Sequence, residues 1–440
     1  MDILFIWPKG PNPFSSDYNK NSLFLRLISR MVAFRKPTTF SILTALTPKE
    51  HNVKVIEGEF KDINFDERYD LVGITTTTCL TNISYKIADE FRKRGAKVVL
   101  GGWHASALPE EAKQHADSVV IGEAEELWPK LLNDMQNEKL KQFYVPNEPV
   151  NPKLIPFSYN VYPNERSVGI HATRGCPNRC EFCSITNTRF RKIYRVRPIP
   201  NVIEEIVKSK NKVFAFQDAS LTINAEYTKK LFRNMIGLNK KFVAMGNIDT
   251  LGKDEELLKL ASEAGCFSWQ IGFESICQES LNSINKTKNV VKNYSKSIKK
   301  IQDYNMAVEG SFIFGFDYDE LDIFHKTDEF IRKNNLKMAY ANVLTPYPGT
   351  PIYDKFEKEG RILTKDWDKY DGHNYVVFQP KHMTPEELLY NMRNLEEKWH
   401  KNYQSIIRIF KNTNFGIYNF VDVVFIEVGW KTMKVNPSKE

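Results

Sequence analysis

Residues Gly169 to Arg191 read GIHATRGCPNRCEFCSITNTRFR, a stretch that joins a short apolar run to a cysteine array. Three cysteines follow the run Gly169 to Ala172 in the spacing C-x3-C-x2-C. Three thiolates on one tight loop can hold three irons of a [4Fe–4S] cluster, which leaves the fourth iron open to a ligand that is not protein. Phe182, between the second and third cysteines, is expected beside that open iron as an apolar wall. The three cysteines are Cys176, Cys180 and Cys183.

The cysteine array has two plainer interpretations, a structural zinc site and three unrelated core cysteines. A structural zinc ion needs a closed tetrahedral set of four ligands, and His171 is the nearby residue that offers a fourth donor. A C-x3-C-x2-C spacing is much more specific than a single C-x2-C pair, although any motif depends on its context. The spacing therefore favours an iron–sulfur cluster with the three cysteines as metal ligands and catalytic centre.

The array resembles the signature of radical S-adenosylmethionine (SAM) enzymes, and the resemblance extends over Asn164 to Tyr353. In that family the open iron chelates the amino and carboxylate groups of SAM. An electron from the cluster then cleaves SAM to a 5′-deoxyadenosyl radical. The resemblance implies that SAM is a cofactor and that an electron donor such as flavodoxin or ferredoxin is a partner.

Strand-like and helix-like segments alternate after the cysteine loop, and six such units resemble the partial (β/α)6 barrel of this family. Barrel enzymes build their sites at the carboxyl ends of the strands, where the cysteine loop also lies. The expected helices cover 202–207, 227–235, 255–264, a segment around Ile298 and Ile301, and 320–333. The expected strands cover 169–172, 213–216, 242–245, 269–273, 308–314 and 339–344.

Polar residues follow several of the expected barrel strands. In the family the end of the fourth strand contacts SAM, so Glu274, after Gly272, is the candidate for its ribose hydroxyls. A carboxylate accepts two hydroxyl hydrogens well. Gln217, Asp218 and Asn247 are candidates for the SAM methionyl group or the substrate. Each of these residues has an alternative role as a helix N-cap or turn residue.

The N-terminal third also alternates strands and helices, which predicts a parallel, doubly wound sheet. Ligands bind such sheets at the carboxyl ends of the strands. The expected strands cover 2–7, 53–56, 71–74, 97–100 and 118–121, and the expected helices cover 82–94, 110–115 and 123–135.

The stretch Gly101 to Leu132, GGWHASALPEEAKQHADSVVIGEAEELWPKLL, resembles the cobalamin-binding domain of one large radical SAM class. The motif D-x-H-x-x-G, which supplies a cobalt-ligating histidine elsewhere, is replaced after the first strand by WPKGPNPFSSD. His104 is the remaining candidate, with a backbone-bonding role as its alternative. The sheet can also cap the barrel without any cofactor. Candidate cobalamin contacts are Thr75, Thr76, Gly101, Gly102, His104, Gly122 and Glu123.

Composition is ordinary for a globular protein, with 42% hydrophobic and 26% charged residues among 440. The predicted division is a cobalamin-binding-like domain 1–145, a proline-rich linker 146–163, the barrel 164–354 and a mainly helical accessory domain 355–440. The net charge of +8 permits anionic partners without selecting one. Six sparse cysteines and the absence of a signal-like or spanning apolar run predict a cytoplasmic protein.

These features together predict a cobalamin-dependent radical SAM enzyme that methylates an unactivated carbon. The alternatives are radical ring closure or rearrangement without methyl transfer, tRNA methylthiolation and a non-enzymatic iron–sulfur protein. Methylthiolation requires three more upstream cysteines, and only Cys79 is present, so a nucleic-acid partner is disfavoured.

The tail after Lys355 resembles a subgroup with hopanoid methylases, bacteriochlorophyll ring methylases and archaeal lipid cyclising enzymes. A lipid-like substrate is therefore one expectation; a tetrapyrrole, a peptide and a small metabolite are the others. The amphipathic stretch Leu23 to Phe34 and the apolar tail Phe415 to Trp430 suggest peripheral membrane contact, with core packing as the alternative.

Overall fold

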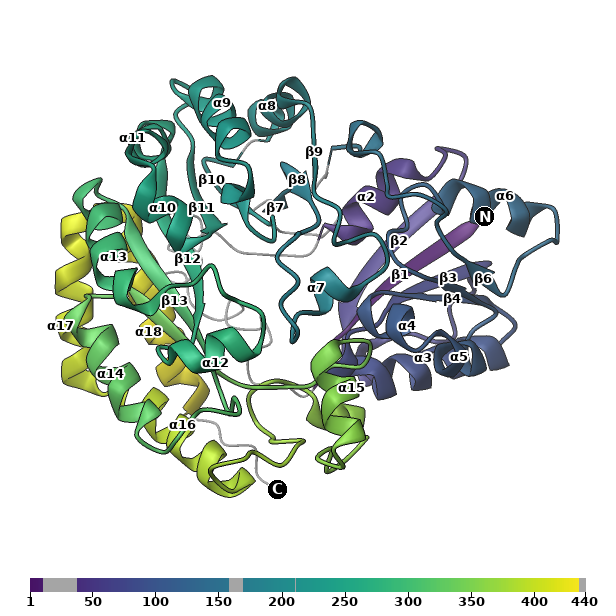
Figure 1. Cartoon of the computed structure of the whole chain (residues 1–440). Coiled ribbons are helices and arrows are strands. Elements are labelled where there is room, and N and C mark those ends of the chain that lie inside the picture. Colours follow the sequence, from purple (N-terminus) through teal and green to yellow (C-terminus); the bar gives the residue numbers. More distant parts are fainter. Residues whose placement is uncertain (11–37, 158–168, 210, 435–440) are drawn as a thin grey trace.

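The computed structural model describes residues 1–10, 38–157, 169–209 and 211–434. Two six-stranded parallel sheets organise these residues (Figure 1). The amphipathic stretch Leu23 to Phe34, and part of the predicted linker, lie outside the described residues. No described helix is both long and apolar enough to cross a membrane.

The N-terminal sheet has the strand order β2-β1-β3-β4-β5-β6, and every neighbouring pair is parallel. The sequence predicted five of these strands and missed β6, which is only two residues long. The strands are β1 (Asp2–Pro8), β2 (Asn52–Gly58), β3 (Leu71–Thr75), β4 (Lys97–Gly101), β5 (Ser118–Val120) and β6 (Phe143–Tyr144).

Helices cover both faces of this sheet, as a doubly wound fold requires. Phe40 of α2 and Trp128 of α6 pack with Phe5 of β1 on one face, with ring centroids 4.9 and 5.1 Å from that of Phe5. Helices α3, α4 and α5 cover the other face. The helices are α2 (Thr39–Leu46), α3 (Thr81–Lys93), α4 (Trp103–Ala107), α5 (Pro109–Ala112) and α6 (Trp128–Gln136), and the 3-10 turns are η3 (Phe60–Asp62), η4 (Thr78–Leu80), η5 (Lys113–His115) and η6 (Pro152–Leu154).

The helix predicted for Glu123 to Met135 starts five residues later than expected. It begins at Trp128 and has Pro129 in its first turn, where a missing backbone N–H costs nothing. Residues 123–127 are instead irregular, and the side chains of Glu123 and Glu125 extend from them toward the second sheet. The prediction of the helix start was wrong because these acidic residues are typical of a first helical turn.

The second sheet has the order β14-β13-β12-β11-β10-β7, again with every pair parallel, which confirms the predicted six barrel strands. Its two edge strands are not paired with each other, so the barrel is partial. The strands are β7 (Gly169–Ile170), β10 (Val213–Phe216), β11 (Lys241–Gly246), β12 (Cys266–Glu274), β13 (Ala307–Phe314) and β14 (Met338–Val343); a separate antiparallel pair joins β8 (Thr173–Arg174) to β9 (Arg195–Val196).

The barrel helices pack their apolar stripes on the outer face of the second sheet. Helix α11 shows why local prediction succeeded there. The Asp254 side chain accepts a hydrogen bond from the Leu257 N–H at 2.9 Å, and Gly265 ends the helix with a φ of +102°. The helices are α7 (Ser184–Asn187), α8 (Ile199–Lys208), α9 (Ala225–Met235), α10 (Ile248–Lys253), α11 (Glu255–Ala264), α12 (Gln278–Ser283), α13 (Tyr294–Asp303), α14 (Ile323–Lys333) and α15 (Pro351–Lys358), with 3-10 turns η7 (Leu221–Ile223) and η8 (Val291–Asn293).

The C-terminal residues add three helices beside the barrel: α16 (Pro385–Trp399), α17 (Asn402–Asn412) and α18 (Ile417–Lys434) (Figure 1). The 3-10 turns η9 (Trp367–Lys369) and η10 (Thr413–Phe415) also belong to this region. Helix α16 begins with a capping box, because the side chain of Thr384 and that of Glu387 each bond the other residue's backbone N–H.

Helix α18 packs against the barrel strands. The Asn419 side chain donates to the Phe267 carbonyl at 2.8 Å, and Asp422 forms a buried ion pair with Lys337. Tyr418 closes a small core cluster on β10, β11 and β12. The core-packing alternative for the tail Phe415 to Trp430 therefore describes most of α18 better than an interfacial role.

Candidate functional site

The cysteine loop begins where β7 ends and is held from several sides. The Asp218 carboxylate, at the end of β10, accepts hydrogen bonds from the Ala172 N–H and from both the N–H and the hydroxyl of Thr173. The Cys176 N–H donates to the Arg191 carbonyl at 2.8 Å, and the Glu181 N–H donates to Ile284 at 3.1 Å. The loop thus has a defined shape before any metal binds.

All three cysteines of the array lie on this loop. Cys176 and Cys180 are buried and Cys183 is half-buried. Burial raises the pKa of the Cys176 thiol and raises that of Cys180 to about 12. No three His, Cys, Asp or Glu side chains of the described residues converge on one metal position, so the zinc alternative with His171 has no closed ligand set here. Each thiolate of a cluster binds a different iron, so the array does not need such convergence.

The end of β12 supplies a charged pair beside the cysteines. Glu274 is buried, has a φ of +62° and forms an ion pair with Lys286. The Lys286 ammonium lies 5.9 Å from the ring centroid of Phe182, which itself packs near Phe316. Burial lowers the pKa of Lys286, but the negative charge of Glu274 and its hydrogen bond with Lys286 outweigh burial and hold that pKa above its usual value. A cation and a carboxylate therefore lie beside the cysteine loop.

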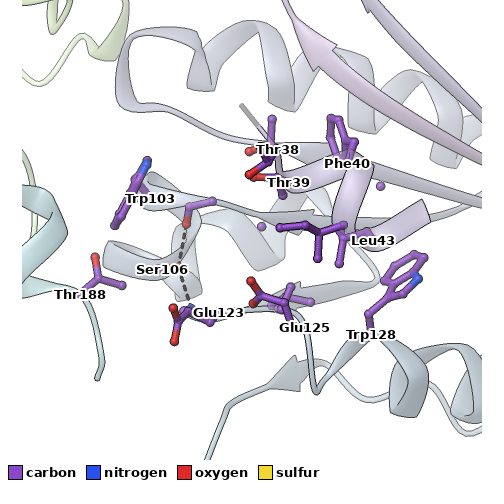
Figure 2. Close-up of a pocket in the computed structure, with 18 of the residues that line it drawn as sticks. Thr38, Thr39, Phe40, Leu43, Trp103, Ser106, Glu123, Glu125, Trp128 and Thr188 are labelled. Atoms are coloured by element: carbon purple, nitrogen blue, oxygen red, sulfur yellow. Dashed lines mark hydrogen bonds between the residues drawn. The ribbon is translucent and has the colours of Figure 1, made fainter. Parts of the chain in front are cut away.

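A cavity of about 330 Å³ lies between the carboxyl edges of the two sheets. One end, shown in Figure 2, is apolar and is lined by Phe40, Leu43 and Trp128. Trp103 and Thr188 lie at the other end, and His171, Arg174 and Gln217 of the barrel also line the cavity. The two halves of the chain thus share one cavity.

Five of the residues predicted as cobalamin contacts line this cavity: Thr75, Gly101, Gly102, Gly122 and Glu123. Gly102 also has a structural reason to be glycine. Its φ is +101°, and a Cβ there would lie 2.6 Å from the Thr76 carbonyl oxygen.

Thr76 and His104 do not line the cavity. The buried Thr76 hydroxyl donates to the Gly101 carbonyl at 2.9 Å and accepts from the Ala105 N–H at 3.0 Å, so its hydrogen bonds hold the turn after β4. The buried His104 ring contacts the carboxylate of Glu111 at 3.1 Å and packs against Trp367. Both residues thus have structural contacts instead of a place in the cavity, and the partner of His104 is a carboxylate rather than the expected backbone group.

Buried ion pairs join the two sheets beside the cavity. Glu123 pairs with Arg191 and with Arg195, each at 2.7 Å, and Glu125 pairs with Arg174 at 2.8 Å. Burial raises the pKa of Glu123, but hydrogen bonding from Arg195 and the charges of both arginines outweigh it and hold the pKa below its usual range. We call these five residues the inter-sheet clamp.

The imidazole of His171 lies beside this clamp. Burial, together with the charges of Arg174 and Arg191, holds the pKa of His171 well below its usual range. The ring is therefore neutral at neutral pH, and it can donate from one nitrogen and accept at the other.

Comparisons with known proteins agree with this arrangement. Residues 170–331 match the Radical SAM superfamily, and residues 42–132 match the B12 binding domain. Bacteriochlorophyllide d C-8(2)-methyltransferase of Chlorobaculum tepidum is 36% identical over 362 residues, which cover 76% of this chain and 79% of that protein. The C-12(1)-methyltransferase of the same organism is 34% identical over 376 residues, covering 79% and 81%. The chain belongs to the cobalamin-dependent radical SAM methyltransferases.

The fold of this methyltransferase is also that of a solved relative. The radical SAM methyltransferase TsrM of Kitasatospora setae, with cobalamin and a [4Fe–4S] cluster bound, superposes with a TM-score of 0.70 over 99% of both chains. At 14% identity that likeness concerns the fold alone. The predicted family, fold class and cofactors, a [4Fe–4S] cluster, SAM and cobalamin, are confirmed.

The cavity of the methyltransferase offers donors that suit cobalamin. The buried Nε atoms of Arg174 and Arg191 have no hydrogen-bond partner among the described residues, and both arginines line the cavity. Amide carbonyls and a phosphate, which cobalamin carries, are acceptors for such N–H groups. The apolar end of the cavity in turn suits a planar, weakly polar ring.

The residues predicted to contact SAM occupy different positions. Gln217 lines the cavity and lies over Gly169, where a Cβ would collide with its amide. Both carboxylate oxygens of Asp218 accept hydrogen bonds from the start of the cysteine loop, so this residue positions that loop. Asn247 caps the start of α10 without a side-chain cap bond, and the Gly272 carbonyl accepts from Asn289 at 3.0 Å.

Sequence reasoning missed the arginines of the clamp, Lys286 and the apolar end of the cavity. Arg191 and Arg195 are four residues apart and follow the array directly, but no local pattern identifies their acidic partners about 70 residues earlier. Phe40, Leu43 and Trp128 resemble ordinary core residues, and only their assembly around one cavity distinguishes them.

Proposed function

We propose that this methyltransferase adds a methyl group to a carbon of a chlorophyll-type tetrapyrrole. This proposal rests on the sequence similarity of the chain to two methyltransferases that are named for carbons of bacteriochlorophyllide d. The shared cavity supports the proposal because it brings a cobalamin-binding sheet against the mouth of a radical SAM barrel. A methyl donor and a radical generator must both reach one substrate carbon.

The three cysteines would hold the cluster, with Phe182 as an apolar wall beside the open iron. Lys286 and Glu274 would bind the carboxylate and the ribose hydroxyls of SAM, exchanging their mutual ion pair for these contacts. Gln217 and Asn247 would contact the methionyl group or the substrate. The cluster supplies the electron that cleaves SAM, and cobalamin carries the methyl group.

On the other side of the cavity, the nucleotide base of cobalamin would lie against Phe40, Leu43 and Trp128. Its amide-bearing edge would accept from Arg174 and Arg191, with Gly101 leaving room for close approach. With its ring turned toward Glu111, His104 would not be a ligand of cobalt.

A lipid-like substrate is the second candidate, but its two supports from the sequence are weak. Leu23 to Phe34 lies outside the described residues, and much of Phe415 to Trp430 packs on the barrel strands. A flavodoxin or ferredoxin as electron donor remains part of the proposal. Such a donor would have to approach the cysteine loop.

The decisive experiment supplies anaerobically reconstituted enzyme with bacteriochlorophyllide d, a reductant and SAM labelled in its methyl group. We expect label in the pigment by mass spectrometry, together with 5′-deoxyadenosine, and neither product from Cys180→Ala. 5′-Deoxyadenosine without labelled pigment would refute the tetrapyrrole substrate. Absence of both products from loaded enzyme would instead contradict the radical mechanism.

A further inference from the structure

Helix α17 presents large apolar side chains to solvent. Tyr403, Ile406, Ile407 and Phe410 are all exposed, and Phe410 reaches 69% exposure. Their spacing of three, four and seven residues places them on one face of the helix. Figure 1 shows α17 at the outer edge of the barrel, on the side away from the N-terminal sheet. Contiguous exposed apolar residues of this kind mark an interaction surface.

The segment of chain that carries this face is basic. Residues 398–421 contain four cations and no Asp or Glu. Lys401 and Lys411, one on each side of the apolar face along the chain, are exposed. Protein–protein interfaces are depleted in lysine, whereas a basic helix with an apolar face is typical of binding to an anionic lipid surface. The four cations are Lys398, Lys401, Arg408 and Lys411.

A cavity of about 280 Å³ lies beside the apolar face, between α14, α16 and α17. Its lining includes one carboxylate, Asp328, which pairs with Arg332 and with Lys398 at 3.0 Å. Arg408 also lines the cavity but pairs with the buried Glu427, so Lys411 supplies the excess positive charge of the lining.

A buried indole also faces this cavity. Trp399 is 4% exposed, and its Nε1–H has no hydrogen-bond partner among the described residues. A buried N–H without an acceptor is costly, so an anionic oxygen that reached it from the cavity would be stabilised by it. The apolar face and the net-positive cavity with its buried donor therefore point to one ligand.

We propose that α17 lies in the headgroup layer of an anionic membrane, with a lipid phosphate in the cavity beside Trp399. At 11 residues the helix is about 16 Å long, which is far too short to span a bilayer but suits binding parallel to its surface. Tyr403, Ile406 and Phe410 enter the boundary of the acyl chains, and Lys401 and Lys411 contact headgroups. This surface is independent of the proposed substrate.

Co-sedimentation of the whole protein with vesicles of phosphatidylglycerol and phosphatidylcholine, against phosphatidylcholine alone, tests the proposal. We expect binding to the anionic vesicles at low salt and weak binding to the neutral ones. Each basic residue near an anionic surface contributes about 1 kcal/mol. Lys401→Glu with Lys411→Glu should therefore weaken binding by at least about 30-fold, whereas the control change Lys358→Glu on α15 should not.

Two further variants separate the features of the surface. Phe410→Ser should weaken vesicle binding, whereas Tyr390→Ser, which alters an equally exposed residue of α16, should not. Trp399→Phe, which removes only the N–H donor, should reduce the preference for anionic over neutral vesicles. Inorganic phosphate at millimolar concentration should not abolish vesicle binding; if it does, the cavity is a site for free phosphate.

Equal binding by the charge-reversed and parent proteins would overturn the proposal. So would a Phe410-dependent self-association in solution without vesicle binding, which would identify a second copy as the occupant of the apolar face.

Discussion

Replacing Glu123 by alanine should open the inter-sheet clamp. The Glu123 carboxylate is 7% exposed and accepts hydrogen bonds from Arg191 at 2.7 Å and from Arg195 at 2.7 and 3.2 Å. Removing one partner of a buried ion pair costs about 3–5 kcal/mol, since the remaining charges lose their compensation. Arg195 still donates to the Val150 carbonyl at 2.8 Å, so we expect the lower end, about 3 kcal/mol.

The same substitution should disturb catalysis more than SAM cleavage. The Arg191 carbonyl accepts the Cys176 N–H, so a displaced Arg191 shifts the cysteine loop relative to the cobalamin-binding sheet. A displacement near 1 Å can cost about 100-fold in a step that needs alignment. Methyl transfer should therefore fall about 100-fold, with a smaller loss of 5′-deoxyadenosine formation.

Urea unfolding monitored by circular dichroism, with both products quantified, measures these effects. Glu110→Ala, at an exposed carboxylate on α5, is the control and should change stability by less than about 0.5 kcal/mol. The Glu123 contribution exists above its ordinary pKa of 4.5 and is lost as pH falls through its lowered folded pKa. A Glu123→Ala protein as stable as Glu110→Ala at pH 7, with both products unchanged, would refute the role of the clamp.

Three further outcomes can be measured. Alanine at Cys176, Cys180 or Cys183 should abolish reductive SAM cleavage, whereas serine at Cys277 should leave it intact. Asp317→Asn should destabilise the protein at pH 7. Burial raises the pKa of the Asp317 carboxyl, but hydrogen bonds from Arg361, Lys355 and Lys381 outweigh burial and lower that pKa to about 2. The difference in stability between the variant and the parent should therefore vanish as the pH falls toward 2. Gly102→Ala should lower cobalamin affinity, measured by corrinoid content after anaerobic reconstitution, and normal content would contradict the steric argument.

Much of the fold could be predicted because its signals are local. The barrel strands are short apolar runs with helical periodicity between them, and β10 and α11 begin and end at the predicted residues. The two-residue strand β6 has no such local pattern, because only its pairing with β5 defines it as a strand. Helix α6 began later than predicted because the acidic residues before it bond to distant arginines rather than to its first turn.

The residues of the candidate site likewise fall into those that a local sequence pattern predicts and those that it does not. The cysteine array and the glycine turns are contiguous in sequence, so their spacing alone indicates a site. Lys286 could not be predicted, since its partner Glu274 is twelve residues away, on the other side of helix α12. Thr76 could not be separated from Thr75 by sequence, because the direction of each hydroxyl depends on the turn after β4.

The order of the strands along the chain also bears on how the protein folds during synthesis. All six strands of the N-terminal sheet come from residues 2–144, before β7 begins at Gly169. Domains generally fold as units and N-terminal ones first, so this sheet can form while the cysteines are still in the ribosome. Glu123 and Glu125 then stand as unpaired acids on the nascent chain. Emergence of Arg174, Arg191 and Arg195 would then neutralise these acids and bring the cysteine loop onto the folded sheet.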